Sequence, residues 1–92
     1  MTTKKITVLG RDNHTEAMRV AAGLTIYGHE VRIIFMNEPV AETEKNAKQS
    51  ELLELADIIP ETTVSEMDNS LSILDSEALA HVFNESDQII NI

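Results

Sequence analysis

Polar residues with chemically useful side chains follow directly after three of the expected strands. The first group runs from Arg11 to His14, the second begins at Asn37, and the third begins at Ser65. Parallel strands present their carboxyl ends at one edge of a sheet, where open α/β folds bind ligands. A helix that begins in the first group also offers backbone N–H groups to an anion. The candidate ligand-binding residues are Arg11, Asp12, Asn13, His14, Asn37, Glu38 and Ser65.

Several of these residues also have a purely structural interpretation. Asn13 is a good helix N-cap, and Glu16 three residues later completes a capping-box pattern, with Asp12 as a competing cap. His14 is the histidine expected closest to the strand ends. Together with Asp12 and Glu38 it defines an alternative function, a small-molecule-binding enzyme or sensor that uses these three side chains.

Other classes of site find no support in the residue pattern. The histidines at positions 14, 29 and 81 include no pair spaced i, i+4, which would direct two imidazoles at one metal. The chain has no cysteine, so disulfides, thiolate metal sites and thiol nucleophiles are excluded. The turn after the first strand lacks the glycines of dinucleotide, Walker and flavin phosphate loops. We therefore expect no metal and no cofactor.

The first third of the chain predicts the elements that position these residues. Lys5 to Gly10 is typical of a buried strand, and an amphipathic helix follows from about Asn13. Gly28 is expected to end the helix in the left-handed conformation. Glu30 to Met36 is a second buried strand. Together these elements form one βαβ unit with parallel strands and a right-handed crossover.

The remaining elements repeat this alternation. A charged helix is predicted from Glu44 to Ala56, a short strand from Thr62 to Val64, a helix capped by Asp75 or Ser76, and a final strand from Asp87 to Ile92. The second helix is expected to pack through Leu52, Leu55, Ala56 and Ile59, and the third through Ala78, Leu79, Val82 and Phe83. The predicted fold is a small three-layer α/β sandwich in βαβαβαβ order, with a mainly parallel sheet of four to five strands.

Length and charge narrow the class of protein. Residues 1–92 form one small domain whose limited core would gain from self-association. Sixteen acidic and seven basic residues give a net charge of −9, which argues against nucleic acid and anionic lipid as partners. No apolar run is long enough for a membrane span or a signal peptide, so a cytoplasmic protein is expected. The acidic surface is open to use as a docking site for a basic protein.

The run EAMRVAAGLTIYGHEVRIIFMNEPV, from Glu16 to Val40, resembles the DsrE/DsrF/DsrH-like sulfur-relay family across its first helix and second strand. The closing SILDSEALAHVFNESDQIINI is similar to the helix-then-strand ending of small DsrH-type members. The resemblance implies a mainly parallel α/β sandwich that assembles as a dimer, trimer or hexamer. It also implies a persulfide-carrying cysteine in the loop after a central strand, here the region from Ser65 to Ser70.

The missing cysteine separates this chain from active members of that family. A hydroxyl cannot hold a transferable sulfane sulfur as a thiolate does. The absence therefore argues against an enzyme of the sulfur-transfer type. We expect a non-catalytic DsrE-like homo-oligomer that binds a protein partner or small ligand at the carboxyl ends of the strands, as an accessory to sulfur relay.

Overall fold

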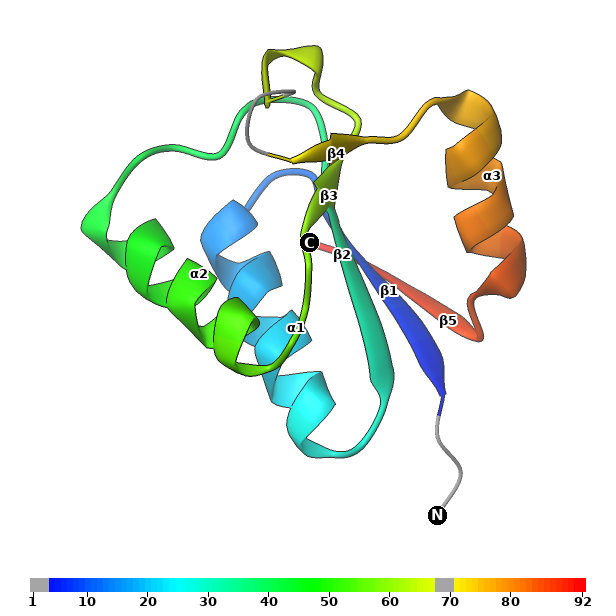
Figure 1. The fold of residues 1–92 in the computed structure, drawn as a ribbon, viewed down its shortest axis with the longest axis horizontal. Coiled ribbons are helices and arrows are strands. Elements are labelled where there is room, and N and C mark those ends of the chain that lie inside the picture. The colour runs from blue at the N-terminus through cyan, green and yellow to red at the C-terminus, as the bar shows by residue number, and fades with distance from the viewer. Residues whose placement is uncertain (1–3, 68–70) are drawn as a thin grey trace.

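Residues 4–67 and 71–92, which the computed structural model describes, form a single parallel sheet with helices on both faces (Figure 1). The strand order is β4-β3-β2-β1-β5. In chain order the elements are β1 (Lys5–Gly10), α1 (His14–Ile26), β2 (Glu30–Phe35), α2 (Glu44–Leu55), β3 (Glu61–Thr62), the 3-10 helix η1 (Ser65–Met67), β4 (Ser72–Ile73), α3 (Ser76–Glu85) and β5 (Gln88–Asn91). The predicted three-layer α/β fold is confirmed.

The order of elements departs from the predicted alternation at one point. β4 is an additional strand that follows β3 and η1 without an α-helix between, and it pairs parallel with β3 at the edge of the sheet. It consists of two exposed residues, Ser72 and Ile73. So short a strand carries no detectable alternation, which is why the sequence pattern did not reveal it.

The larger part of the core lies between the sheet and the layer formed by α1 and α2. Figure 1 shows these two helices on one side of the sheet and α3 on the other. The cluster beneath α1 and α2 consists of Val8, Ala17, Met18, Ala21, Ile33, Phe35, Leu53 and Ile58. The cluster beneath α3 has three buried residues, Leu9, Ile34 and Val82. The sheet is therefore covered unequally on its two faces.

The ends of α1 follow the predicted signals. The Asn13 side chain accepts a hydrogen bond from the Glu16 N–H, so Asn13 rather than Asp12 caps the helix. Gly28 has a φ of +84°, the left-handed conformation expected after a helix. Residues next to each end of α1 therefore determine where the helix that connects β1 and β2 begins and ends.

The packing face predicted for α2 is wrong for three of its four residues, whereas Ala56 packs against the core as predicted. Leu53, not Leu52, is the buried leucine, whereas Leu52, Leu55 and Ile59 are exposed. The reason lies nearly two turns earlier, at the buried Asn46. Asn46 shares the inward face with Leu53 because seven residues make nearly two turns. Hydrogen bonds from Asn46 to other segments hold the helix in this rotation.

In the part of the chain that the structure describes, no helix has the length and the apolar character needed to cross a membrane.

Candidate functional site

The turn after β1 is tightly packed against the second strand. Gly10 ends β1, and a Cβ at this position would lie 3.2 Å from both Ala17 Cβ and Phe35 Cδ1 and 3.4 Å from His14 Cδ2. A side chain at Gly10 would therefore force these neighbouring side chains to shift by a few tenths of an ångström. The space left by its missing side chain lets α1 begin directly against the end of β2.

His14 uses that space to connect the two loops. Its Nε2 lies 3.3 Å from the Met36 carbonyl oxygen, and its ring meets Phe35 edge-on with a centroid distance of 5.3 Å. The side chain is half-buried. An imidazole in this position is already engaged with its surroundings, so its observed role is to hold the start of α1 against the end of β2.

Asn37 makes a second connection between the same loops. Its backbone has a φ of 74°, a left-handed conformation that asparagine tolerates better than most residues. Its side-chain amide donates a hydrogen bond to the Arg11 carbonyl oxygen over 3.2 Å. The structure thus brings Arg11, His14 and Asn37 together, as their positions after neighbouring strands predicted.

The other candidates do not join this group. Asp12 and Glu38 are exposed, and no hydrogen bond or ion pair within residues 4–67 and 71–92 links either carboxylate to His14. Ser65 is exposed at the start of η1, beyond β3. Of the Ser65-to-Ser70 loop, residues 68–70 lie outside the described residues. An assembled Asp12, His14 and Glu38 triad is not seen.

Backbone donors at this turn are also largely occupied. The N–H groups of Arg11 and Asp12 both donate to the Ile92 carbonyl oxygen, over 2.8 and 3.0 Å. The Glu16 N–H is taken by the Asn13 cap. The expectation that this helix start offers a set of unpaired donors to an anion is therefore only partly met. The cap takes the Glu16 N–H of the first turn, and Ile92, which follows β5, takes two N–H groups just before the helix.

A concave surface lies beside this turn, at the carboxyl ends of β2 and β3. It is a shallow, open groove of about 530 Å³, and a smaller, mostly apolar cavity of about 120 Å³ shares Val40, Asn46 and Met67 with it. None of the seven candidates lines either space. The groove is lined by Val40, Ala41, Glu42, Thr43, Glu44, Asn46, Ala47 and Met67.

Asn46 holds one wall of this groove in place. It is 8% exposed, and its side-chain amide donates to the Ala41 carbonyl oxygen over 2.7 Å while its Oδ1 accepts from the Thr15 hydroxyl. Its backbone N–H donates to the Thr43 hydroxyl, which caps α2. One buried side chain therefore ties the loop before α2 to α1.

Sequence reasoning missed Asn46 and the groove. Few large apolar residues lie between Ala41 and Ser50, so the predicted packing residues of this helix all came from its second half. The available signal was Thr43 with Asn46 three residues later, which is the spacing of a capping interaction. Which way the Asn46 side chain would point was not encoded in that spacing.

The groove combines apolar surface with negative charge. Val40, Ala47 and Met67 supply apolar surface, and the exposed carboxylates Glu42 and Glu44 supply negative charge. No cation lies within 4.0 Å of either carboxylate in the part of the chain that the structure describes. In the same part, no three His, Asp or Glu side chains are grouped so that they could hold a metal ion.

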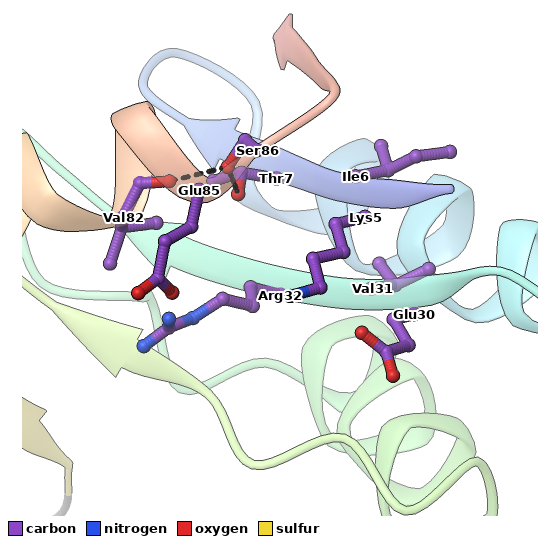
Figure 2. A pocket seen from close by; sticks show the side chains of 9 residues that line it. All are labelled: Lys5, Ile6, Thr7, Glu30, Val31, Arg32, Val82, Glu85 and Ser86. Carbon is purple, nitrogen blue, oxygen red and sulfur yellow. Dashed lines mark hydrogen bonds between the residues drawn. The ribbon is translucent and has the colours of Figure 1, made fainter. Parts of the chain in front are cut away.

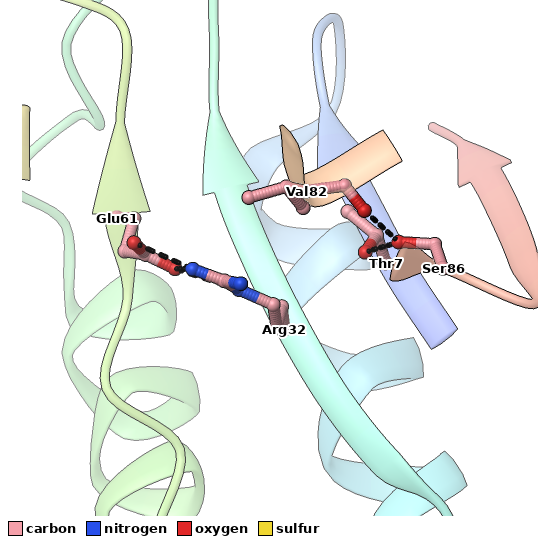
Figure 3. A network of polar contacts seen from close by, with 5 residues as sticks. All are labelled: Thr7, Arg32, Glu61, Val82 and Ser86. Carbon is pink, nitrogen blue, oxygen red and sulfur yellow. Dashed lines mark hydrogen bonds and ion pairs between the residues drawn. The ribbon is translucent and has the colours of Figure 1, made fainter. Parts of the chain in front are cut away.

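A second cavity, of about 140 Å³, lies on the α3 face near the amino ends of β1 and β2. Figure 2 shows Lys5 and Arg32 beside the carboxylates of Glu30 and Glu85. Arg32 is already paired with Glu61 in a two-pronged contact at 2.9 to 3.1 Å (Figure 3). The charges are mixed and the position is remote from the carboxyl ends, so the groove is the stronger candidate.

Comparison with known proteins identifies no relative. No protein-family model matches the chain, and no match was found among curated proteins or among solved structures.

Proposed function

We propose that this chain is a non-catalytic, cytoplasmic homo-oligomer that binds a protein partner or small ligand at the carboxyl ends of its strands. The single observation that carries the proposal is the groove between the Val40–Glu44 segment and Met67. Grooves with apolar surface and a few fixed polar groups are the usual form of ligand and peptide sites.

The composition of the groove favours one kind of ligand. Apolar floor residues accept an aliphatic or aromatic group, and the Glu42 and Glu44 carboxylates attract a neighbouring positive charge. A lysine or arginine side chain within an apolar segment of a partner has both properties. A cationic peptide segment therefore fits better than an anion, in keeping with the net charge of −9.

A role beside sulfur relay rests on the resemblance of Glu16 to Val40 to DsrE-like proteins. The chain has no cysteine to carry a persulfide. An accessory subunit that binds a sulfur carrier without transferring sulfur itself agrees with both facts. The carrier would present a cationic, partly apolar surface to the groove.

Native mass spectrometry of the purified protein tests this proposal first. We expect a defined oligomer, with an additional mass if a small ligand is retained. Partner capture then compares wild type with Glu42→Gln, which removes one rim charge, and with Glu77→Gln on α3 as a matched control. The proposal requires that Glu42→Gln weaken capture and that Glu77→Gln leave it unchanged.

The alternative, an enzyme or sensor that uses Asp12, His14 and Glu38, makes a different prediction. His14→Ala and Asp12→Ala would then abolish ligand binding and leave assembly intact. Its one structural support is the half-buried position of His14 at the strand ends. Unchanged binding in both variants rejects the alternative.

A further inference from the structure

The smaller cavity beside the groove at the strand ends reaches into the larger core. Its volume is about 120 Å³, and its mostly apolar walls include Met18, Phe35 and Leu53, which are buried members of the cluster beneath α1 and α2. A cavity of about 150 Å³ with an aliphatic and aromatic lining holds one benzene molecule. The cavity in this core therefore has room for one apolar group about the size of a leucine side chain.

A further groove, of about 410 Å³, adjoins the same cavity. The cavity shares Val40, Asn46 and Met67 with the groove at the strand ends. With the further groove it shares a different set of residues, Ser50, Leu53, Pro60 and Leu71. The three spaces therefore follow one another with the cavity in the middle, and we call them together the long groove.

One seam of α2 forms a wall of all three spaces. Asn46, Ser50 and Leu53 are separated by four and three residues, the spacing of one helix face, and each lines two of the three spaces. Thr43 lines one end of the long groove and Glu54 the other, so the groove extends about 16 Å along the helix at about 1.5 Å per residue. An extended peptide of about five residues has this length.

The opposite wall is held by contacts with the sheet. Met67 ends η1, and its sulfur lies 3.8 Å from the hydroxyl of the buried Thr62. The same hydroxyl donates a hydrogen bond to the Phe35 carbonyl oxygen over 2.8 Å. Hydrogen bonds of Asn46 position the wall on α2. Walls that are fixed in advance lose little conformational freedom when a ligand binds.

Carboxylates lie at both ends of the long groove and not at its centre. Glu42 and Glu44 line the groove at the strand ends, and Glu54 lines the further groove. Among the described residues, none with a charge lines the cavity, and no lysine, arginine or histidine lines any of the three spaces. The complementary ligand is therefore apolar in the middle and positively charged on either side.

We propose that the long groove binds an extended peptide segment of a partner protein, with an apolar side chain in the cavity and a lysine or arginine two residues away on each side. Alternate side chains of an extended segment point the same way, so the first, third and fifth all face the groove. Two charges on opposite sides of one apolar group require a ligand longer than a small molecule. The inference rests on the proposed function, since it specifies the ligand of the same site.

NMR titrations with capped pentapeptides test the chemistry of this ligand. The probes are KALAK, its central-alanine form KAAAK and its acidic form EALAE. We expect KALAK to bind about 30-fold more tightly than KAAAK, because leucine buries three more carbon atoms than alanine, and EALAE not to bind. Equal affinities for KALAK and KAAAK, or for KALAK and EALAE, overturn the inference.

Variants of α2 place the peptide in the long groove. Ser50→Leu puts an apolar side chain at the boundary between the cavity and the further groove, and should remove the preference for KALAK over KAAAK. Ser50 is exposed, so the fold should survive, and urea denaturation checks this. Ser76→Leu makes the same change at an exposed position of α3 and should bind like wild type. A wild-type preference in Ser50→Leu contradicts an anchor in the cavity.

The charge at the far end of the long groove has its own test. Glu54→Gln should weaken KALAK binding about threefold, the size expected for one exposed charge pair, and added salt should reduce the difference. Glu77→Gln on α3 is the matched control and should bind like wild type. If Glu54→Gln also binds like wild type, the peptide does not extend into the further groove.

The remaining outcomes separate this inference from the proposed function. Isopentylamine carries a leucine-like group and one positive charge, and we expect it to bind at least about tenfold more weakly than KALAK because it spans only part of the groove. If it binds as tightly, the site takes a small ligand, so this inference fails and the proposed function stands. If wild type does not bind KALAK, this inference also fails, and partner capture with Glu42→Gln decides the proposed function separately.

Discussion

The two faces of the sheet are stabilised in different ways. Beneath α1 and α2, buried side chains from both helices, from β1 and β2 and from the segment after α2 form one apolar cluster. Beneath α3 the apolar cluster is small, and the first halves of β1 and β2 carry Thr7 and Arg32 instead. There a hydroxyl pair and an exposed ion pair replace apolar contacts (Figure 3). A parallel sheet normally has both faces covered, so the α3 face is where this domain departs from the general rule.

Adjacent residues of β2 provide the most direct comparison of the two faces. Ile33 and Ile34 are both 0% exposed, and they belong to the clusters beneath α1–α2 and α3 respectively. We expect Ile33→Ala to lower the free energy of unfolding by about 3 to 5 kcal/mol and Ile34→Ala by about 2 to 3 kcal/mol, because the smaller cluster can close part of its cavity. Urea denaturation measures both. Equal losses would show that the two faces contribute equally.

The hydroxyl pair of Thr7 and Ser86 on the α3 face should make the next largest contribution to the free energy of unfolding. The Ser86 hydroxyl donates to the Val82 carbonyl oxygen over 2.6 Å, so the buried Thr7 hydroxyl, 2.6 Å away, donates to Ser86. Ser86→Ala leaves the Thr7 hydroxyl without this partner and should cost about 1 to 3 kcal/mol. Denaturation of the Ser86→Ala, Thr7→Val double variant should show a smaller loss than Ser86→Ala alone. A larger loss in the double variant would show that the unpaired Thr7 hydroxyl is not the cause of the loss in Ser86→Ala.

The ion pair between Arg32 and Glu61 should contribute less to the free energy of unfolding than the hydroxyl pair does. The Arg32 side chain is 43% exposed, and water therefore screens the attraction. A double-mutant cycle with Arg32→Met and Glu61→Gln should give a coupling energy below about 1 kcal/mol, and added salt should reduce it. A coupling that is insensitive to salt would indicate that the pair is shielded from water.

The smallest contribution to stability is expected from the pair of Arg19 and Glu16, on the outside of the α1 and α2 layer. A side-chain hydrogen bond from Arg19 lowers the pKa of Glu16 below its ordinary value of 4.5. The pair therefore stabilises the fold above about pH 4.5, and this contribution disappears as the pH falls through the lowered pKa of Glu16. In Arg19→Gln, an NMR titration should place the Glu16 pKa closer to 4.5. An unchanged Glu16 pKa in this variant would show that Arg19 does not cause the lowering.

Local signals predicted the elements around the strand ends well. Asn13 caps α1, Asp75 caps α3, and Gly28 adopts its left-handed turn. Each depends on a side chain within a few residues of the backbone it serves, so a short stretch of sequence contains the whole interaction. The candidate residues that meet, Arg11, His14 and Asn37, were predicted for a different reason, since the strand ends of a parallel sheet converge.

The sequence by itself determined the α/β class, the βαβ crossover and the edge of the sheet at which polar residues gather. Only the tertiary structure decided the rotation of α2, the additional strand β4 and the groove beside Val40. The physical reason is the range of the interactions involved. Asn46 selects the buried face of α2 through contacts with Thr15 on α1 and with Ala41 before α2, and the contact with α1 depends on how the two helices lie together.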